Sequence, residues 1–543
     1  MTQELVLRVE DLTVALPPGA DRNHAVTGIN LSLAAGEVFC LIGESGSGKS
    51  VIAFSVMRLL AGNLPVTRGQ VWFEGENLLA LTPAAMRALR GRRMGMIFQE
   101  PMTALNPVMS CGVQLDEVLR CHTRLNSAER RARIVAMLER VRLPDPDRIY
   151  RSYPHQVSGG QRQRIMIAMA LLLRPRLLIA DEPTTALDVT TQAEILALIK
   201  ELQRDTGAAV LFITHDFGVV AEIADQVAVL EKGRLVESGQ AQTLLRAPQH
   251  PYSQLLLSAI PSMIPKRSGV KGASEFILET RSLTRVFGGT GLWRKSAGVR
   301  AVDSVSLRAP VRETLAVVGE SGSGKSTLAR LIAQLLPATS GEIVFGERDV
   351  GMLSRTQRHA LRQRIQVVFQ DPYRSLNPRR TVGAGITEGP MNFGVLKKEA
   401  WRRAANLMEL VKLSPQALDR YPHEFSGGQR QRICIARALA LEPTLLIADE
   451  AVSALDVSVQ AQVLELLEDI QQRLHLSMIF ITHDLRVAAQ IAHRIVVMQK
   501  GQIVESGITE EVFRAPATEY TRSLLAAAPG QGFVFGQSPS TAV

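Results

Sequence analysis

The chain has 543 residues, more than a single hydrophobic core accommodates, so two large domains or several small ones are expected. Hydrophobic residues make up 46% of the sequence and charged residues 21%, an ordinary globular composition that excludes disordered, collagen-like and small disulfide-rich proteins. The formal net charge is +10, but no run of basic residues alternates with aromatic residues. We therefore expect a solvated basic surface near a membrane and no nucleic-acid partner.

Cysteine usage and the apolar segments indicate the compartment. Four scattered cysteines form no CxxC pair, which argues against a zinc or iron–sulfur site; they are Cys40, Cys111, Cys121 and Cys434. The first ten residues lack a basic segment followed by an apolar one, and no uninterrupted apolar stretch of about 20 residues occurs. We expect reduced thiols, a cytoplasmic location and no membrane-spanning segment.

In chain order, the first half alternates short apolar runs with helical segments. Residues 37–42, 177–180 and 210–213 are typical of buried strands, and residues 191–204 have the pattern of a helix that ends near Gly207. This alternation predicts an α/β fold with a parallel sheet.

The chain then repeats its motifs. The eight residues Gly-Glu-Ser-Gly-Ser-Gly-Lys-Ser at 43–50 recur at 319–326, and Ile-Thr-His-Asp at 213–216 recurs at 481–484. A single repeat of this length indicates a duplicated domain and not a solenoid. We expect a first domain at 1–262, a linker at 263–273, a second domain at 274–530 and a flexible tail at 531–543.

Each copy of the eight-residue motif follows an apolar run and fits GxxxxGK[ST], the Walker A loop, whose backbone N–H groups cradle phosphates together with the next helix. We expect Lys49 and Lys325 to reach the β- and γ-phosphates of ATP, and Ser50 and Ser326 to ligate Mg²⁺. The expected ATP-binding residues here are Gly43, Glu44, Ser45, Gly46, Ser47, Gly48, Lys49, Ser50 and Val51, and Gly319, Glu320, Ser321, Gly322, Ser323, Gly324, Lys325, Ser326 and Thr327.

Two acids follow a second apolar run in each half. Asp181 and Asp449 suit the coordination of Mg²⁺, and the adjacent Glu182 and Glu450 suit the polarisation of the attacking water. In open α/β sheets ligands bind at the carboxyl ends of strands, which is where these runs would deliver the acids.

A further pair of motifs resembles the ABC ATPase family. Ser158, Gly159, Gly160 and Gln161, and again Ser426, Gly427, Gly428 and Gln429, match the signature sequence of that family. The resemblance covers nearly the whole chain. It implies two tandem ABC-type P-loop nucleotide-binding domains, each with a mostly parallel core sheet, an antiparallel β subdomain and a helical signature subdomain.

The resemblance also implies the remaining site residues. Gln99 and Gln370 match the Q-loop, which contacts nucleotide and metal, Asp188 and Asp456 match the D-loop, and His215 and His483 match the switch histidine, a catalytic residue. The signature of one half is expected to close over the γ-phosphate held by the other half, which gives two composite sites for ATP and Mg²⁺.

Two classes of paired cassettes remain open at this point, transporter subunits and soluble factors that act on ribosomes or nucleic acid. The soluble type resembles this chain but has a long charged helical linker, whereas the linker expected here is about a dozen residues. The transporter class is favoured.

Within that class the chain resembles the oligopeptide/dipeptide/nickel importer subfamily. The resemblance lies in the segments 98–107 and 369–378 and in the extension at 246–257, which 514–525 matches more loosely. The fused layout, with Tyr-Pro-His before each signature, most resembles microcin C-type peptide importers and next the glutathione importers. This implies a peripheral subunit on the cytoplasmic face of the bacterial inner membrane that docks on two transmembrane permeases and, through them, serves an extracytoplasmic peptide-binding protein.

The cargo stays open among oligopeptides, dipeptides, microcin C, glutathione, muropeptides and nickel, because cargo does not touch this subunit. The adenine contact is a separate expectation. The family stacks the base on an aromatic residue after the first strand, a place taken by Phe287 in the second half and by Leu16 in the first, with Trp293 and His24 as alternatives.

Overall fold

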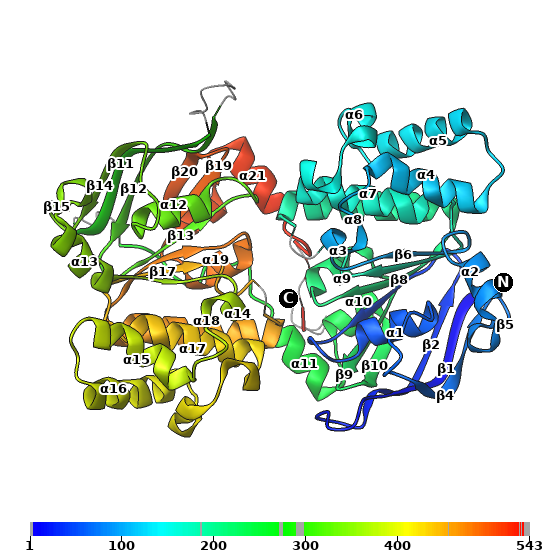
Figure 1. Ribbon diagram of the computed structural model, residues 1–543, viewed down its shortest axis with the longest axis horizontal. Coiled ribbons are helices and arrows are strands. Elements are labelled where there is room, and N and C mark those ends of the chain that lie inside the picture. Colours follow the sequence, from blue (N-terminus) through cyan, green and yellow to red (C-terminus); the bar gives the residue numbers. More distant parts are fainter. Residues whose placement is uncertain are drawn as a thin grey trace, which may run out of the picture. The chain divides into compact units, whose positions relative to one another are not determined.

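The computed structural model describes residues 4–184, 187–270, 275–288, 298–453, 455–531, 533, 535 and 536. These residues form two compact units (Figure 1). The second unit holds residues 188–190 and 259–528, and the first unit holds the other described residues.

The first unit contains a six-stranded sheet in the order β10-β9-β3-β8-β7-β6 and a four-stranded antiparallel sheet in the order β2-β1-β4-β5. Neighbours in the larger sheet are parallel except β9 and β10. The strands are β1 (Leu5–Ala15), β2 (His24–Ala34), β3 (Val38–Ile42), β4 (Val66–Phe73), β5 (Glu76–Asn77), β6 (Met94–Ile97), β7 (Leu177–Asp181), β8 (Ala209–Thr214), β9 (Gln226–Glu231) and β10 (Arg234–Gln240).

The helices of the first half fall into core, signature and extension groups. They are α1 (Lys49–Val56), α2 (Pro83–Leu89), α3 (Pro101–Ala104), α4 (Cys111–His122), α5 (Ser127–Arg140), α6 (Pro146–Arg151), α7 (Gly159–Leu171), α8 (Val189–Thr206), α9 (Phe217–Ile223), α10 (Ala241–Arg246) and α11 (Pro251–Ser258), with short 3₁₀ turns at Leu78–Ala80 and Pro154–Gln156.

The two sheets of the first unit share one hydrophobic core. Leu12 and Val26 of the antiparallel sheet pack with Leu41 of β3 and Ile52 of α1, and all four side chains are fully buried. Burial of four such side chains from separate elements fixes the start of α1 against the end of β3.

The second unit repeats this arrangement, with sheet orders β16-β17-β18-β13-β19-β20 and β12-β11-β14-β15. Its strands are β11 (Phe276–Phe287), β12 (Val299–Pro310), β13 (Thr314–Val318), β14 (Ser340–Phe345), β15 (Arg348–Asp349), β16 (Ile365–Val368), β17 (Leu445–Asp449), β18 (Ser477–Ile481), β19 (Arg494–Gln499) and β20 (Gln502–Ile508). Its helices are α12 (Lys325–Ile332), α13 (Arg355–Arg364), α14 (Pro372–Ser375), α15 (Val382–Asn392), α16 (Lys397–Leu410), α17 (Gly427–Leu439), α18 (Val457–Arg473), α19 (Leu485–Ile491), α20 (Thr509–Arg514) and α21 (Glu519–Ala526), with 3₁₀ turns at Val350–Met352, Pro415–Asp419 and Pro422–Glu424.

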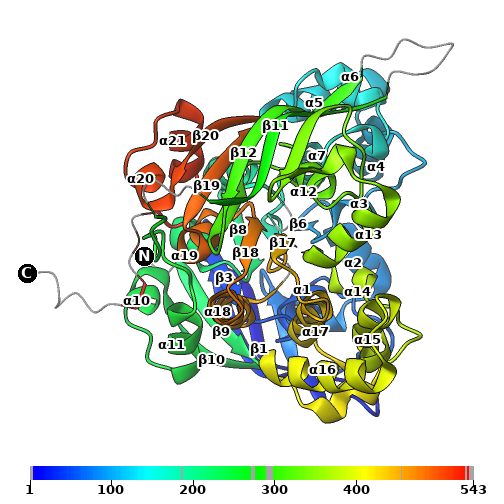
Figure 2. The same cartoon turned by 90° about the vertical axis from the view of Figure 1, so that its left-hand side faces the viewer.

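Seen from its own side, the second unit has its helices α15, α16 and α17 at the end away from β11 and β12 (Figure 2). Met408 of α16, Ile433 of α17 and Leu446 of β17 pack together there. A mostly parallel core sheet, an antiparallel subdomain and a helical signature subdomain are therefore present in each unit, which confirms the predicted fold class. Over the described part of the chain, no helix combines the length and hydropathy needed to span a bilayer.

The segment before β11 packs on the second unit. Gln490 Nε2 donates to the carbonyl of Ser262 at 2.7 Å, and the amide of Lys266 donates to the carbonyl of Ala489 at 2.9 Å. The guanidinium of Arg267 lies 2.5 Å from Glu468 of α18. Residues 262–267 thus have specific partners, although their composition is that of a linker.

Candidate nucleotide-binding sites

The Walker A loop of the first unit connects β3 to α1. All five residues of β3 are buried, so the loop leaves the sheet at its carboxyl end. Gly48 has a φ of 108°, and a Cβ there would lie 2.5 Å from Val26 Cγ1, so the loop requires glycine at this position. Lys49 begins α1 and its Nζ donates to the carbonyls of Gly43 at 2.6 Å and Glu44 at 2.9 Å. The loop thus joins the end of β3 to the start of α1, an order of elements in which backbone amides bind phosphate.

The second unit builds the same loop between β13 and α12. Gly324 has a φ of 103°, and Lys325 Nζ donates to the carbonyls of Gly319 at 2.8 Å and Glu320 at 2.7 Å. Burial lowers the pKa of Lys325, and nearby carboxylates, Glu450 and Asp449 foremost, oppose that change. The two lysines predicted to reach phosphate occupy equivalent places.

The residues predicted to hold Mg²⁺ are adjacent in both units. Ser50 Oγ donates to Asp181 Oδ1 at 3.0 Å, and Ser326 Oγ donates to Asp449 Oδ1 at 2.9 Å. Burial raises the pKa of Asp181 to about 6, against the hydrogen bond from Ser50, and the pKa of Asp449 is raised for the same reason. Hydroxyl and carboxylate oxygens are the ligands that Mg²⁺ prefers, so the donor set fits this ion.

Three strand ends converge on the next residue, Glu182. Gln99 follows β6 and donates from Nε2 to Glu182 Oε2 at 3.1 Å, and His215 Nδ1, after β8, lies 3.3 Å from the same oxygen. Glu182 itself has a φ of 46°, which is rare for a residue with a side chain and is typical of strained functional positions. The structure thus brings together three residues that were predicted separately.

The second unit gives the same cluster. Gln370 Nε2 lies 2.9 Å and His483 Nδ1 lies 3.5 Å from Glu450 Oε2, and Glu450 has a φ of 50°. Burial raises the pKa of Glu450, but its hydrogen bond and charge interaction with His483 outweigh burial and leave the pKa lowered. Burial lowers the pKa of His483, and the contact with Glu450 outweighs it, so the histidine pKa ends above its ordinary value.

The signature residues form helix N-termini. Ser158 caps α7 and accepts from the amide of Gln161 at 3.3 Å, and Ser426 caps α17 and accepts from the amide of Gln429 at 3.4 Å. Each signature therefore begins a helix, whose first amides are the groups an anion would contact, and the anion site stays a prediction. Asp188 directly precedes α8, and Asp456 is the N-cap residue of α18.

The candidate adenine contacts differ between the units. Phe287 ends β11 with 39% of its surface exposed and carries the Arg285 guanidinium 4.8 Å above its ring. Leu16 follows β1 and packs against the core, and His24 opens β2. Trp293 lies outside the described residues. The adenine contact stays a prediction.

Two residues that the motif analysis did not single out also lie at the Walker A loops. Tyr252 of α11 is hydrogen-bonded to Glu44, and Tyr520 of α21 is hydrogen-bonded to Glu320. The sequence repeat could have pointed to these two tyrosines, because each lies in the extension segment that occurs in both halves.

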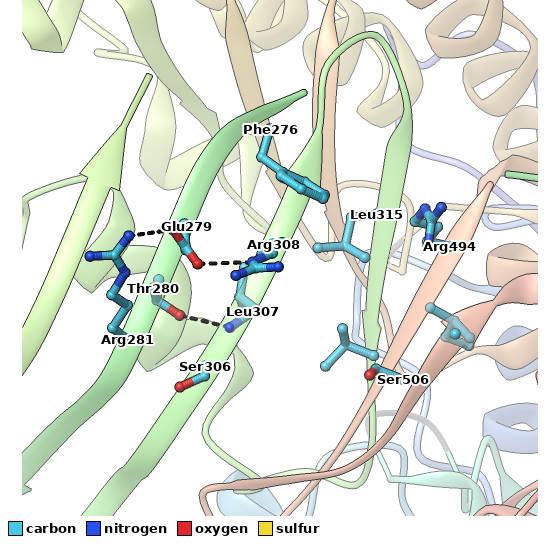
Figure 3. Close-up of a pocket in the computed structure, with 13 residues that line it drawn as sticks. Phe276, Glu279, Thr280, Arg281, Ser306, Leu307, Arg308, Leu315, Arg494 and Ser506 are labelled. Carbon is cyan, nitrogen blue, oxygen red and sulfur yellow. Dashed lines mark hydrogen bonds and ion pairs between the residues drawn. The ribbon is translucent and has the colours of Figure 1, made fainter. Parts of the chain in front are cut away.

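A separate hollow of about 620 Å³ lies in the second unit, beside β11, β12, β19 and β20 (Figure 3). Glu279 accepts hydrogen bonds from Arg281 and Arg308 inside it, and Arg494 pairs with Glu313. Its lining includes none of the phosphate-site residues, and these charges already have partners. The hollow therefore gives no second anion site.

Comparison with known proteins agrees with this geometry. The family described as ABC transporter matches residues 26–185 and 302–453, and the family described as oligopeptide/dipeptide transporter, C-terminal region, matches residues 236–282. The chain is 47% identical over 559 residues to the protein named glutathione import ATP-binding protein GsiA of Escherichia coli K12, covering 96% of this chain and 89% of that protein. The protein of the same name from Salmonella paratyphi A is 46% identical over the same shares.

Two solved structures that resemble the chain each cover less than half of it. One is the ATP-binding cassette MJ0796 bound to ADP and Pi, with 28% identity, 43% of this chain, 98% of that chain and a TM-score of 0.40. Another is cbiO1 from Clostridium perfringens, with 28% identity, 45% of this chain, 92% of that chain and a TM-score of 0.39. The assignment rests on the sequence matches: the chain belongs to the ABC transporter family, as an ATP-hydrolysing subunit of the oligopeptide and dipeptide importer type.

Proposed function

We propose that this chain energises the import of peptides or peptide-like compounds by hydrolysing ATP at two sites. The observation that carries the proposal is the Gln–Glu–His cluster beside a Walker A loop, which both halves contain in the same geometry. Among the cargoes, a glutathione-like peptide is the first to test, because the relative from Escherichia coli K12 is named a glutathione import protein; a microcin C-type peptide, which the fused layout favours, is the second.

Hydrolysis requires a positioned water and neutralisation of charge on the γ-phosphoryl group. Lys49 and Lys325 supply positive charge, and Glu182 and Glu450 orient the water. Gln99 and His215 hold the carboxylate of Glu182, as Gln370 and His483 hold that of Glu450. Ser50 and Asp181 in the first unit, and Ser326 and Asp449 in the second, would hold Mg²⁺, with contributions from Gln99 and Gln370. The ion would supply positive charge to the phosphates.

The partners follow from the same proposal. The chain docks on two permease subunits near Gln99 and Gln370, at the cytoplasmic face of the bacterial inner membrane, and an extracytoplasmic binding protein delivers the cargo. We propose that the two cassettes form composite sites, in which each Walker A loop faces the signature of the other cassette. The cassettes are residues 1–262 and 274–530, with a linker at 263–273 and a tail at 531–543.

The test is the double variant Glu182→Gln and Glu450→Gln, assayed with the permeases in lipid nanodiscs. Turnover should fall at least about 100-fold, because a general base contributes 10² to 10⁴. ATP binding, measured by equilibrium titration, should persist because the amide keeps the shape of the side chain. Turnover above a tenth of wild type would remove the glutamates from this role, and stimulation by ribosomes would favour the soluble class.

A further inference from the structure

The C-terminal extension of each half contacts the phosphate-binding loop of the same half. In the second unit the amide of Glu320 donates to the hydroxyl of Tyr520, on α21, at 3.3 Å. Glu320 is the first residue after Gly319 in the Walker A motif, 200 positions from Tyr520 in the chain. The contact is therefore a product of the fold and not of local sequence.

The first unit has a tyrosine at the corresponding place. Tyr252 of α11 interacts with the backbone and the side chain of Glu44. The region that matches the oligopeptide/dipeptide transporter family spans residues 236–282 and includes this tyrosine. The part of the chain that is typical of peptide importers thus touches the loop that is common to all P-loop ATPases.

The residue that each tyrosine holds is also held by the Walker lysine. Lys49 Nζ donates to the carbonyl of Glu44 at 2.9 Å, and Lys325 Nζ donates to the carbonyl of Glu320 at 2.7 Å. In the second unit Glu320 is therefore held at its N–H by the tyrosine, and at its C=O by the lysine and by the amide of Ser323 at 3.2 Å. When the lysine turns to a phosphate, the tyrosine still holds the N–H of this residue.

Burial raises the pKa of Tyr520 to about 12, against the hydrogen bond from Glu320, so the hydroxyl keeps its proton at physiological pH. A neutral hydroxyl both accepts from the loop amide and retains a proton to donate. Packing of the ring alone needs no hydroxyl, whereas holding the loop amide does.

We propose that Tyr252 and Tyr520 are positioning residues that hold the Walker A loops in the conformation that receives the phosphates of ATP. The extension then contributes to nucleotide binding in each cassette, in addition to any role in recognising the permease. A loop ordered before binding loses less conformational freedom on binding, so the hydroxyls increase affinity for nucleotide.

The experiment replaces each tyrosine by phenylalanine, which removes the hydroxyl and keeps the ring. Tyr252→Phe is made in a chain whose other site carries Lys325→Ala, and Tyr520→Phe in a chain that carries Lys49→Ala, so that one cassette binds at a time. The dissociation constant of fluorescent N-methylanthraniloyl-ATP should rise roughly 3- to 10-fold, as expected for one lost hydrogen bond. The first cassette should show the larger rise, because Tyr252 contacts both the backbone and the side chain of Glu44.

Two further measurements separate positioning from packing. In the chain with both substitutions and intact lysines, KM for ATP should rise while kcat at saturating ATP changes less than about twofold. GTP should show the same proportional rise, because the tyrosines act at the phosphate end and not at the base. The matched control is Tyr150→Phe, a tyrosine of α6 that packs against Gly112 away from both loops. Unchanged affinity in both tyrosine variants, an equal rise in the control, or a loss confined to kcat would each overturn the proposal.

Discussion

At the scale of single residues, burial gives Asp181 and Asp449, the aspartates proposed to hold Mg²⁺, an unusual ionisation. Asp181 is 2% exposed, and its pKa of about 6 lies above the value of 3.8 for an exposed aspartate. The folded chain therefore holds this proton more tightly than the unfolded chain. The carboxyl stabilises the fold fully below about pH 4, and that contribution is lost as the pH rises through 6.

We predict that Asp181→Asn makes the first cassette more stable at pH 8 by about 1 to 3 kcal/mol, since one pKa unit corresponds to 1.36 kcal/mol. The asparagine oxygen still accepts from Ser50 but carries no buried charge. At pH 4 the variant and the wild type should be nearly equal in stability, and the variant should lose ATPase activity. Thermal unfolding followed at both pH values measures this, and an equal effect at pH 4 and pH 8 would contradict the ionisation argument.

At the scale of elements, the segment before β11 is held by a buried ion pair. Arg267 has 9% of its side chain exposed, lies 2.5 Å from Glu468 of α18 and donates to Gln471 at 3.2 Å. The charge and hydrogen bonds of Arg267, followed by Lys266, lower the pKa of Glu468 more than burial raises it. This pairing persists above the ordinary pKa of glutamate and weakens as the pH falls through the lowered value.

We predict that Arg267→Met costs about 1 to 2 kcal/mol at neutral pH, because it removes a largely buried guanidinium from Glu468, a carboxylate that is 24% exposed and keeps Lys266 as a partner. Lys266 pairs with the same carboxylate at 3.3 Å but is 59% exposed, so Lys266→Met is the matched control and should cost less than about 1 kcal/mol. Urea unfolding of the full chain compares them. Equal costs would show that the segment is held by its backbone contacts and not by the guanidinium.

At the scale of the whole molecule, each cassette carries a complete set of the residues proposed for ATP hydrolysis. Because each proposed site draws on both cassettes, a change in one cassette should affect hydrolysis at the site of the other. Ser158→Arg places a bulky cation at the first signature. It should reduce hydrolysis at the site built on Lys325, while nucleotide still binds at the site built on Lys49. Photo-crosslinking of labelled ATP and single-turnover hydrolysis in each half provide the measurement, with Ser158→Ala as the control of similar size. A defect confined to the Lys49 site would contradict the pairing of opposite cassettes.

The conformations of the Walker A loops and of the signature caps were predictable from the sequence because they depend on local geometry. A short apolar strand, GxxxxGK[ST] and a helix form one continuous segment. The conformation of residues 43–50 and 319–326 can therefore be predicted from the sequence of that segment alone. The same holds for Ser158 and Ser426, whose caps depend on a residue three positions away. The duplication made each of these patterns doubly visible.

The sequence by itself therefore determined the fold class and the duplication, and it placed Glu182 and His215 after apolar strands, whereas Gln99 was assigned only by resemblance to the Q-loop. Only the tertiary structure decided that these three meet, because β6, β7 and β8 are neighbours in the sheet although about 80 residues separate Gln99 from Glu182. It also decided that Tyr520 reaches Glu320 and that Leu16, partly buried, packs against the core. These contacts depend on strand order and on the packing of side chains far apart in the chain, and neither motif spacing nor hydrophobic periodicity encodes them.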